Sequence, residues 1–254
     1  VLAIIGEDYG EGASVIQERT HAYALKSCMC LLDPRPHLPK MVEMVRQGFE
    51  LSEASSMPVL MELRIRACHV RGSFEAKDNQ PSPISTRAPM SEAAPFDYAK
   101  LAHPPVTFGQ EVRKVTERLP AAQAFIEAHG LNETFAGSDQ RLGLIVQGGL
   151  YNTLIRSLRE LGLANEQGDS RLPILVLNVV YPLVPEQIEK FCSGKRAVLV
   201  LEEGQPEFIE QEIATHLRRR DALGLVLFVL ALHLWLLAGT PQWLIPASDT
   251  PLQT

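Results

Sequence analysis

Two apolar runs flank a helical pattern in residues 28–65, which read CMCLLDPRPHLPKMVEMVRQGFELSEASSMPVLMELRI. The first run, Cys28 to Leu32, is followed by a proline-rich turn. From about Leu38 to Ala54 apolar residues recur at helical spacing, and a second apolar run covers Val59 to Ile65. Strand, crossover helix and strand make a βαβ unit, which belongs to a mostly parallel sheet. We therefore expect an α/β fold.

The second half of the chain repeats this pattern. Strands are expected at 142–146, 174–177 and 196–201, alternating with helices at about 151–161, 182–191 and 208–217. Residues 79–105 are rich in Pro, Ser and Ala, which is typical of a linker, and a bridging helix is expected over 106–129. The sequence therefore predicts two doubly wound, mostly parallel-sheet domains, at 1–78 and 141–220, joined by 79–140.

Composition excludes several classes of protein. The formal net charge of −6 over 254 residues argues against a nucleic-acid groove, which needs clustered basic residues. The four cysteines are too few for a disulfide scaffold, so a cytoplasmic location is expected. Cys28-Met29-Cys30 and Cys68-His69 lack the spacing of a structural zinc site or an iron–sulfur site, so we predict no metal site in this chain.

An apolar segment of eighteen residues, 222–239, follows three arginines at 218–220. Three interpretations stay open for it: a membrane anchor, a tail that arises from a frame error, and a buried helix. We expect an apolar C-terminal helix within a tail, 221–254, that is distinct from the two domains. The chain would be membrane-anchored through 222–239 only if this segment is native.

The loop after the first strand has the densest set of polar side chains. An apolar strand that we expect to be buried, 1–5, leads into a glycine-rich loop at its carboxyl end, where open α/β sheets place ligands. The chain starts inside this strand and without Met, so we expect it to be a piece of a longer protein. The candidate residues that edge a substrate or cofactor site are Glu7, Asp8, Glu11, Ser14, Gln17, Glu18 and Arg19.

Three other patterns have two interpretations each. Gly148-Gly149, between a strand and a helix, is either a phosphate cradle or a tight turn. Glu202-Glu203 is either an acid–base or metal pair, or a cap of the next helix. We expect Arg64 and Arg66 to point outward from their strand. There they either hold an anion or lie on a solvated face of the sheet.

Several sequence blocks, in order and spacing, resemble the indolepyruvate ferredoxin oxidoreductase alpha subunit. The blocks similar to its pyrimidine-binding domain are Ile4–Gly10, Ser14, Gln17–Arg19, Pro34, Phe49–Glu53 and Pro58–Leu60. The blocks similar to its transketolase C-terminal-like domain are Leu144–Val146, Gly148-Gly149, Val180–Leu183, Val198–Glu203 and Ile209-Glu210. The resemblance extends from about Val1 to Arg220.

This resemblance implies a thiamine diphosphate-dependent oxidoreductase. Such enzymes decarboxylate an aryl 2-oxo acid such as indolepyruvate, form a thioester on coenzyme A, and pass electrons through iron–sulfur clusters to ferredoxin. The polar loop would then edge the cofactor pocket, since thiamine itself carries the difficult step.

The resemblance also implies missing parts. The Glu that activates the aminopyrimidine would precede Val1, and the domain for diphosphate and magnesium would follow the second domain. The cluster cysteines are not in this sequence. The implied partners are the remaining domains, a second oxidoreductase subunit, ferredoxin, the 2-oxo acid and coenzyme A, and the chain alone is expected to be inactive. The alternative is a tail-anchored interaction scaffold derived from such an enzyme.

Overall fold

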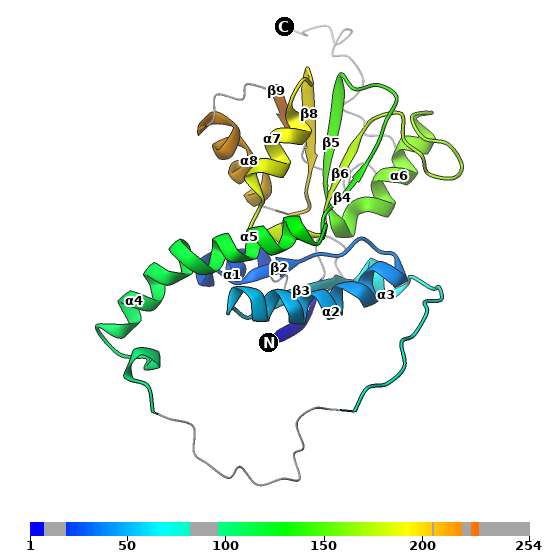
Figure 1. Ribbon diagram of the computed structural model, residues 1–254. Helices are drawn as coiled ribbons and strands as arrows, with labels where there is room; N and C mark the ends of the chain where they lie inside the picture. The colour runs from blue at the N-terminus through cyan, green and yellow to red at the C-terminus, as the bar shows by residue number, and fades with distance from the viewer. Residues whose placement is uncertain (8–18, 82–95, 205, 220–224, 229–254) are drawn as a thin grey trace, which may run out of the picture.

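The computed structural model describes residues 1–7, 19–81, 96–204, 206–219 and 225–228 of the chain (Figure 1). These residues form two sheets with helices packed on them, and helix α5 crosses between the two layers in Figure 1. The predicted α/β class with two mostly parallel sheets is confirmed.

The first sheet contains the βαβ unit. Its strands lie in the order β1 (Leu2–Glu7), β3 (Val59–Arg64), β2 (Cys30–Leu32) and β7 (Val179–Tyr181). The first three are parallel, and β7 runs antiparallel to β2. Its helices are α1 (Thr20–Ser27), α2 (Leu38–Ser55) and the short α3 (Ile65–Cys68). Helix α2 begins with Pro39 in its first turn, where the missing N–H costs nothing.

The second sheet repeats the architecture with five strands. Their order is β4 (Glu133–Phe135), β6 (Ile174–Leu177), β5 (Leu142–Gln147), β8 (Ala197–Leu201) and β9 (Leu225–Phe228). Only β4 is antiparallel to its neighbour among these described strands. The helices are α6 (Tyr151–Glu160), α7 (Pro185–Cys192) and α8 (Phe208–Arg219).

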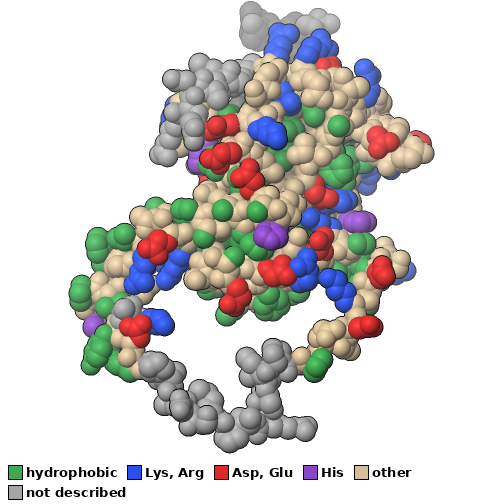
Figure 2. Space-filling view, viewed as in Figure 1, with side chains coloured by type: hydrophobic (Ala, Val, Ile, Leu, Met, Phe, Trp, Pro, Cys, Tyr) green, Lys and Arg blue, Asp and Glu red, His purple; other side chains and the backbone are tan. Residues whose placement is uncertain are grey.

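A long helical rod lies between the two halves in the sequence. It consists of α4 (Val106–Arg113), a π-helical turn (Lys114–Arg118) and α5 (Leu119–Ala128), and a short turn of helix at Tyr98–Lys100 precedes it. Helix α5 packs on α2 of the first sheet. Helix α4 projects beyond both sheets in Figure 1, and hydrophobic side chains lie on the surface of this projecting part in Figure 2. Phe108 on α4 is 75% exposed.

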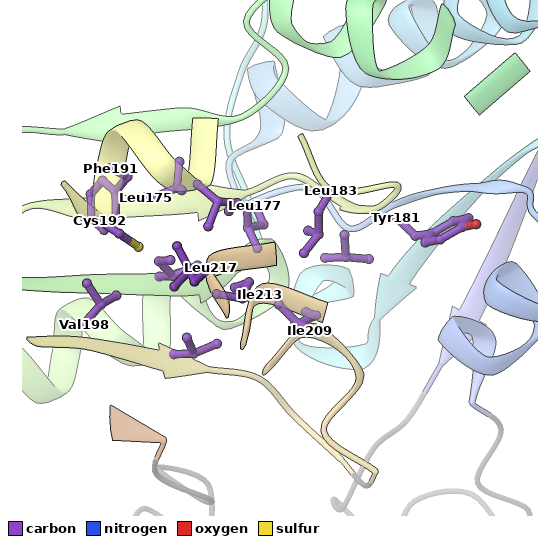
Figure 3. Packing of buried hydrophobic residues seen from close by; sticks show 14 of the residues in the cluster. Leu175, Leu177, Tyr181, Leu183, Phe191, Cys192, Val198, Ile209, Ile213 and Leu217 are labelled. Atoms are coloured by element: carbon purple, nitrogen blue, oxygen red, sulfur yellow. The ribbon is translucent and has the colours of Figure 1, made fainter. Parts of the chain in front are cut away.

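The two sheets share a hydrophobic core. Leu31 and Leu60 of the first sheet lie in one buried cluster with Ile145 and Leu175 of the second, and helix α8 adds Ile213 (Figure 3). Burying each such side chain contributes about 1.5–3 kcal/mol to stability. The halves are therefore joined by packing as well as by the chain.

Two expectations about apolar segments were wrong. Strand β1 is an edge strand with β3 as its neighbour in the sheet, so Ile4 is 56% exposed and not buried. The described part of 222–239 is not a helix: Leu225–Phe228 forms β9, parallel to β8, and the rest lies outside the described residues. Among the described residues no helix has the length and apolar character needed to span a membrane.

Candidate functional site

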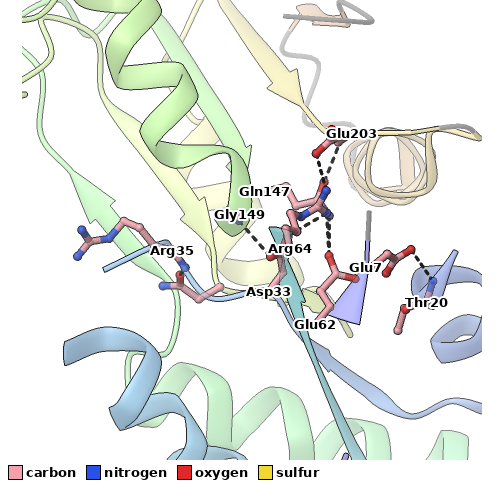
Figure 4. A network of polar contacts seen from close by, with 10 residues as sticks. Glu7, Thr20, Asp33, Arg35, Glu62, Arg64, Gln147, Gly149 and Glu203 are labelled. Carbon is pink, nitrogen blue, oxygen red and sulfur yellow. Dashed lines mark hydrogen bonds and ion pairs between the residues drawn. The ribbon is translucent and has the colours of Figure 1, made fainter. Parts of the chain in front are cut away.

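The carboxyl ends of strands from both sheets meet at one buried junction (Figure 4). Parallel strands end at the same edge of their sheet, which is why polar residues from distant parts of the sequence lie together here. We call this set the junction cluster: Glu7, Asp33, Glu62, Arg64, Gln147 and Glu203.

Arg64 is the centre of the junction cluster. Its Nη1 donates to Glu203 Oε2 at 2.5 Å, and its Nη2 donates to Glu62 Oε1 at 2.7 Å and to Asp33 Oδ2 at 3.3 Å. The Arg64 side chain is only 4% exposed. The expectation that Arg64 points outward was therefore wrong, because the second sheet covers the end of β3. Strand β3 ends at Arg64, and Arg66 lies in α3 instead of continuing the strand.

Residues of the second sheet complete the cluster. Gln147 donates from Nε2 to Glu62 Oε1 at 3.4 Å, and its Oε1 accepts the Glu203 backbone N–H at 3.0 Å. The Gly149 N–H donates to Asp33 Oδ1 at 3.1 Å. A Cβ on Gly148 would lie 1.7 Å from the Asp33 carbonyl oxygen. Asp33 thus occupies the place that a phosphate would need, and Gly148-Gly149 forms a tight turn.

The cluster contains four carboxyl groups and one guanidinium, all buried. Burial raises the pKa of Glu62 well above 4.5, and the neighbouring Asp33 and Glu7 add to this rise while Arg64 opposes it. Burial thus favours the protonated form of Glu62, and the geometry provides a buried carboxyl group that can hold a proton.

An asparagine holds Asp33 in place. The side chain of Asn178, which follows β6, donates to the Leu131 carbonyl and to Glu133 Oε2, both at 2.9 Å. Its backbone carbonyl accepts the Asp33 N–H at 2.8 Å. Arg35 makes a two-pronged ion pair with Glu133 at 3.0 and 2.9 Å. These contacts of Asn178 and Arg35 fix the turn after β2 against the second sheet.

Two of the seven loop residues predicted as site candidates are described by the structure. Glu7 lies in the junction cluster, where its Oε1 accepts the Thr20 backbone N–H at 3.0 Å. Arg19 donates to the Pro206 carbonyl at 3.0 Å and lies over the Phe208 ring. The other five, Asp8, Glu11, Ser14, Gln17 and Glu18, lie outside the described residues.

Glu202 and Glu203 have different roles. Glu202 caps α8, since its two oxygens accept the Ile209 and Glu210 N–H groups at 3.0 Å each, as the capping interpretation predicted. Glu203 instead pairs with Arg64. Within the part of the chain that the structure describes, no cluster of His, Cys, Asp and Glu has the geometry to hold a metal ion. All four cysteines are free thiols.

The comparisons with known proteins agree with this fold. Residues 132–222 match the family described as indolepyruvate ferredoxin oxidoreductase middle domain. The indolepyruvate oxidoreductase subunit IorA of Methanothermobacter thermautotrophicus is 29% identical over 214 residues, which are 84% of this chain and 32% of that protein. IorA of Thermococcus kodakarensis is 24% identical over 215 residues, which are 84% of this chain and 32% of that protein.

A solved structure shows the same fold at low sequence identity. It is the 2-oxoglutarate:ferredoxin oxidoreductase of Magnetococcus marinus, with 2-oxoglutarate, coenzyme A and succinyl-CoA bound; its TM-score is 0.50 at 13% identity. The match covers 80% of this chain and 39% of that one. The chain spans about a third of the length of its curated relatives. Residues 132–222 therefore match the family described as indolepyruvate ferredoxin oxidoreductase middle domain, and the chain is similar along most of its length to IorA subunits.

Proposed function

We propose that this chain supplies part of an indolepyruvate ferredoxin oxidoreductase, which oxidatively decarboxylates aryl 2-oxo acids to acyl-CoA and passes the electrons to ferredoxin. The observation that carries this proposal is the similarity to IorA subunits over 84% of the chain. The fold shared with a 2-oxoglutarate:ferredoxin oxidoreductase supports the same class of reaction. We propose a cytoplasmic location, as expected from the sparse cysteines.

The described residues do not fit thiamine diphosphate and magnesium by themselves. They contain no group suited to a metal ion, and the glycine turn that could have received a phosphate is filled by Asp33. We therefore assign diphosphate and magnesium binding, and the iron–sulfur clusters, to other parts of the enzyme. The chain alone is then inactive and needs the remaining domains and a second subunit, with coenzyme A and ferredoxin as co-reactants.

The role that we propose for this chain is to position the polar loop. Glu7 ends β1 at the junction cluster and Arg19 holds the start of α1 to the segment after β8. Both ends of the loop are thus attached to fixed structure, which is what a segment that edges a pocket requires. We propose that 1–78 and 141–220 are the two functional units, with 79–140 as the connection and 221–254 as a separate tail.

A chimera tests the proposal. The matched region of Methanothermobacter thermautotrophicus IorA is replaced by residues 1–220 of this chain, and the product is purified with its partner subunit. We expect indolepyruvate-dependent and coenzyme A-dependent reduction of ferredoxin, and no turnover by the 254-residue chain with thiamine diphosphate and magnesium. A folded, cofactor-loaded chimera without activity would refute the proposed function, and turnover by the chain alone would refute its dependence on other parts.

The loop assignment has its own variant pair in this chimera. Glu7→Gln removes the charge at the end of β1, so we expect kcat to fall by about tenfold or more, in line with the loss of a positioning contact. Glu43→Gln, on the exposed side of α2, changes the same chemical group without touching the junction and serves as the control. Equal activities of the two variants would exclude a role for Glu7.

A further inference from the structure

Two carboxyl groups of the junction cluster lie side by side without a donor between them (Figure 4). Glu62 Oε1 accepts from Arg64 and Gln147, and Glu7 Oε1 accepts from Thr20. The second oxygen of each group, Oε2, is fully buried and has no hydrogen-bond donor in the described part of the chain. The Glu62 side chain is 0% exposed and Glu7 as a residue is 3% exposed, so water does not solvate them.

Such an arrangement is costly if both groups are ionised. A carboxylate can only accept hydrogen bonds, and a buried polar atom without a partner destabilises the fold, the more so when it is charged. Arg64 already binds Asp33, Glu62 and Glu203, so it faces three negative charges before Glu7 is counted. One proton on either Glu7 or Glu62 would remove a charge and create the missing donor in a single step.

We propose that Glu7 and Glu62 share one proton at neutral pH, and that this shared proton fastens the end of β1 to the second sheet. The connection runs from Glu7 to Glu62, and from Glu62 through Gln147 and Arg64 to β5 and to Glu203. Because β1 is an edge strand, its last residue is held by the ladder with Arg64 of β3 and by the Thr20 N–H, and the shared proton adds the attachment to the second sheet. Loss of the proton releases the end of β1 from the junction.

Burial and two neighbouring carboxyl groups favour the protonated form of Glu62, and Arg64 opposes them. The groups that face Glu62 are Glu7 of β1, Asp33 after β2, Arg64 of β3 and Gln147 of β5. Glu203 after β8 binds Arg64, and His21 of α1 also interacts with Arg64. Burial, together with Arg19 and Arg64, lowers the pKa of His21 to about 4, so this imidazole is neutral and supplies no compensating positive charge. Arg64 is thus the one cation among these facing groups.

Infrared spectroscopy of the full chain tests the proposal. A protonated carboxylic acid has a C=O stretching band apart from that of carboxylates, and the band shifts in D2O. We expect this band in the wild-type protein at pH 7 and its loss in Glu62→Gln. The amide N–H of this variant donates to Glu7, so no protonated carboxyl group is needed. Glu7→Gln should lose the band as well, because its amide donates to Glu62. Glu43→Gln should keep it.

Hydrogen exchange gives a second readout that a merely structural role would not produce. We expect amide exchange at the end of β1 to accelerate in the wild type as alkaline pH removes the proton, and to stay slower in Glu62→Gln at the same pH. Glu62→Met, which has no donor, should exchange fast at every pH. A wild-type spectrum without the acid band at pH 7, or a band that persists in both glutamine variants, would overturn the proposal.

Discussion

Removal of the Arg64 guanidinium is the sharpest test of how the two sheets are held together. Arg64→Met keeps most of the side-chain volume but leaves Asp33, Glu62 and Glu203 buried without their shared cation, at side-chain exposures of 2%, 0% and 6%. Breaking a buried ion pair by removing one partner costs about 3–5 kcal/mol. We therefore expect the free energy of unfolding at pH 7 to fall by about that amount.

The matched control is Arg46→Met on the outer face of α2. Arg46 also pairs with two carboxylates, Glu43 and Glu50, but its side chain is 47% exposed. Exposed pairs contribute about 0–1 kcal/mol, so this variant should unfold nearly as the wild type does. Urea unfolding followed by far-ultraviolet circular dichroism measures both variants against the wild type. A loss below about 1 kcal/mol for Arg64→Met would refute the central role of Arg64.

The loss of unfolding free energy in Arg64→Met should depend on pH. Arg64 lowers the pKa of Glu62 in the wild type, so removal of Arg64 raises this pKa further and the folded variant binds a proton more readily than the unfolded chain. The penalty from Glu62 is then absent at low pH, where the carboxyl group is protonated in both proteins, and grows as rising pH removes that proton. A deficit that stays constant from pH 5 to pH 8 would indicate lost packing instead of lost charge pairing.

Three further measurements follow from the same geometry. Gly148→Ala should destabilise the fold by about 3 kcal/mol or more in urea, since its Cβ would meet the Asp33 carbonyl oxygen; a neutral effect would contradict this contact. The His21 imidazole should titrate near pH 4 by NMR, so its stabilising contribution is lost as the pH falls from about 6.5 toward 4; a midpoint near 6.5 would contradict its burial. Iodoacetamide should modify exposed Cys68 but spare Cys30, because burial raises the pKa of the Cys30 thiol to about 12.

The βαβ unit could be predicted because its signals are local. The apolar residues of α2 recur at helical spacing, Met57-Pro58 marks the end of the helix, and β3 is a continuous apolar run. Strands β4 and β7 were not predicted because each has three residues, too few to show a period. Their place in the sheets depends on partners far away in the sequence.

The junction cluster could be predicted only in part. The rule that ligand sites lie beyond strand ends identified Glu7, and the same rule applied to β2 and β5 would have found Asp33 and Gln147. Arg64 was wrongly expected to point outward, because alternation along a strand tells which residues share a face but not whether another sheet covers that face. Glu62 had no local signal, since the groups around it include Glu7, Asp33 and Gln147, which come from three other segments of the chain.

The insertion of β7 into the first sheet has a consequence for how the molecule is made. A ribosome releases β1, α2 and β3 long before Val179–Tyr181, so the edge of β2 at Leu31 and Leu32 stays open while most of the chain is still being synthesised. Open strand edges recruit strands of other molecules, and pairings between distant segments form slowly. The first sheet is therefore begun early and closed late, and the nascent chain is most prone to aggregate in that interval.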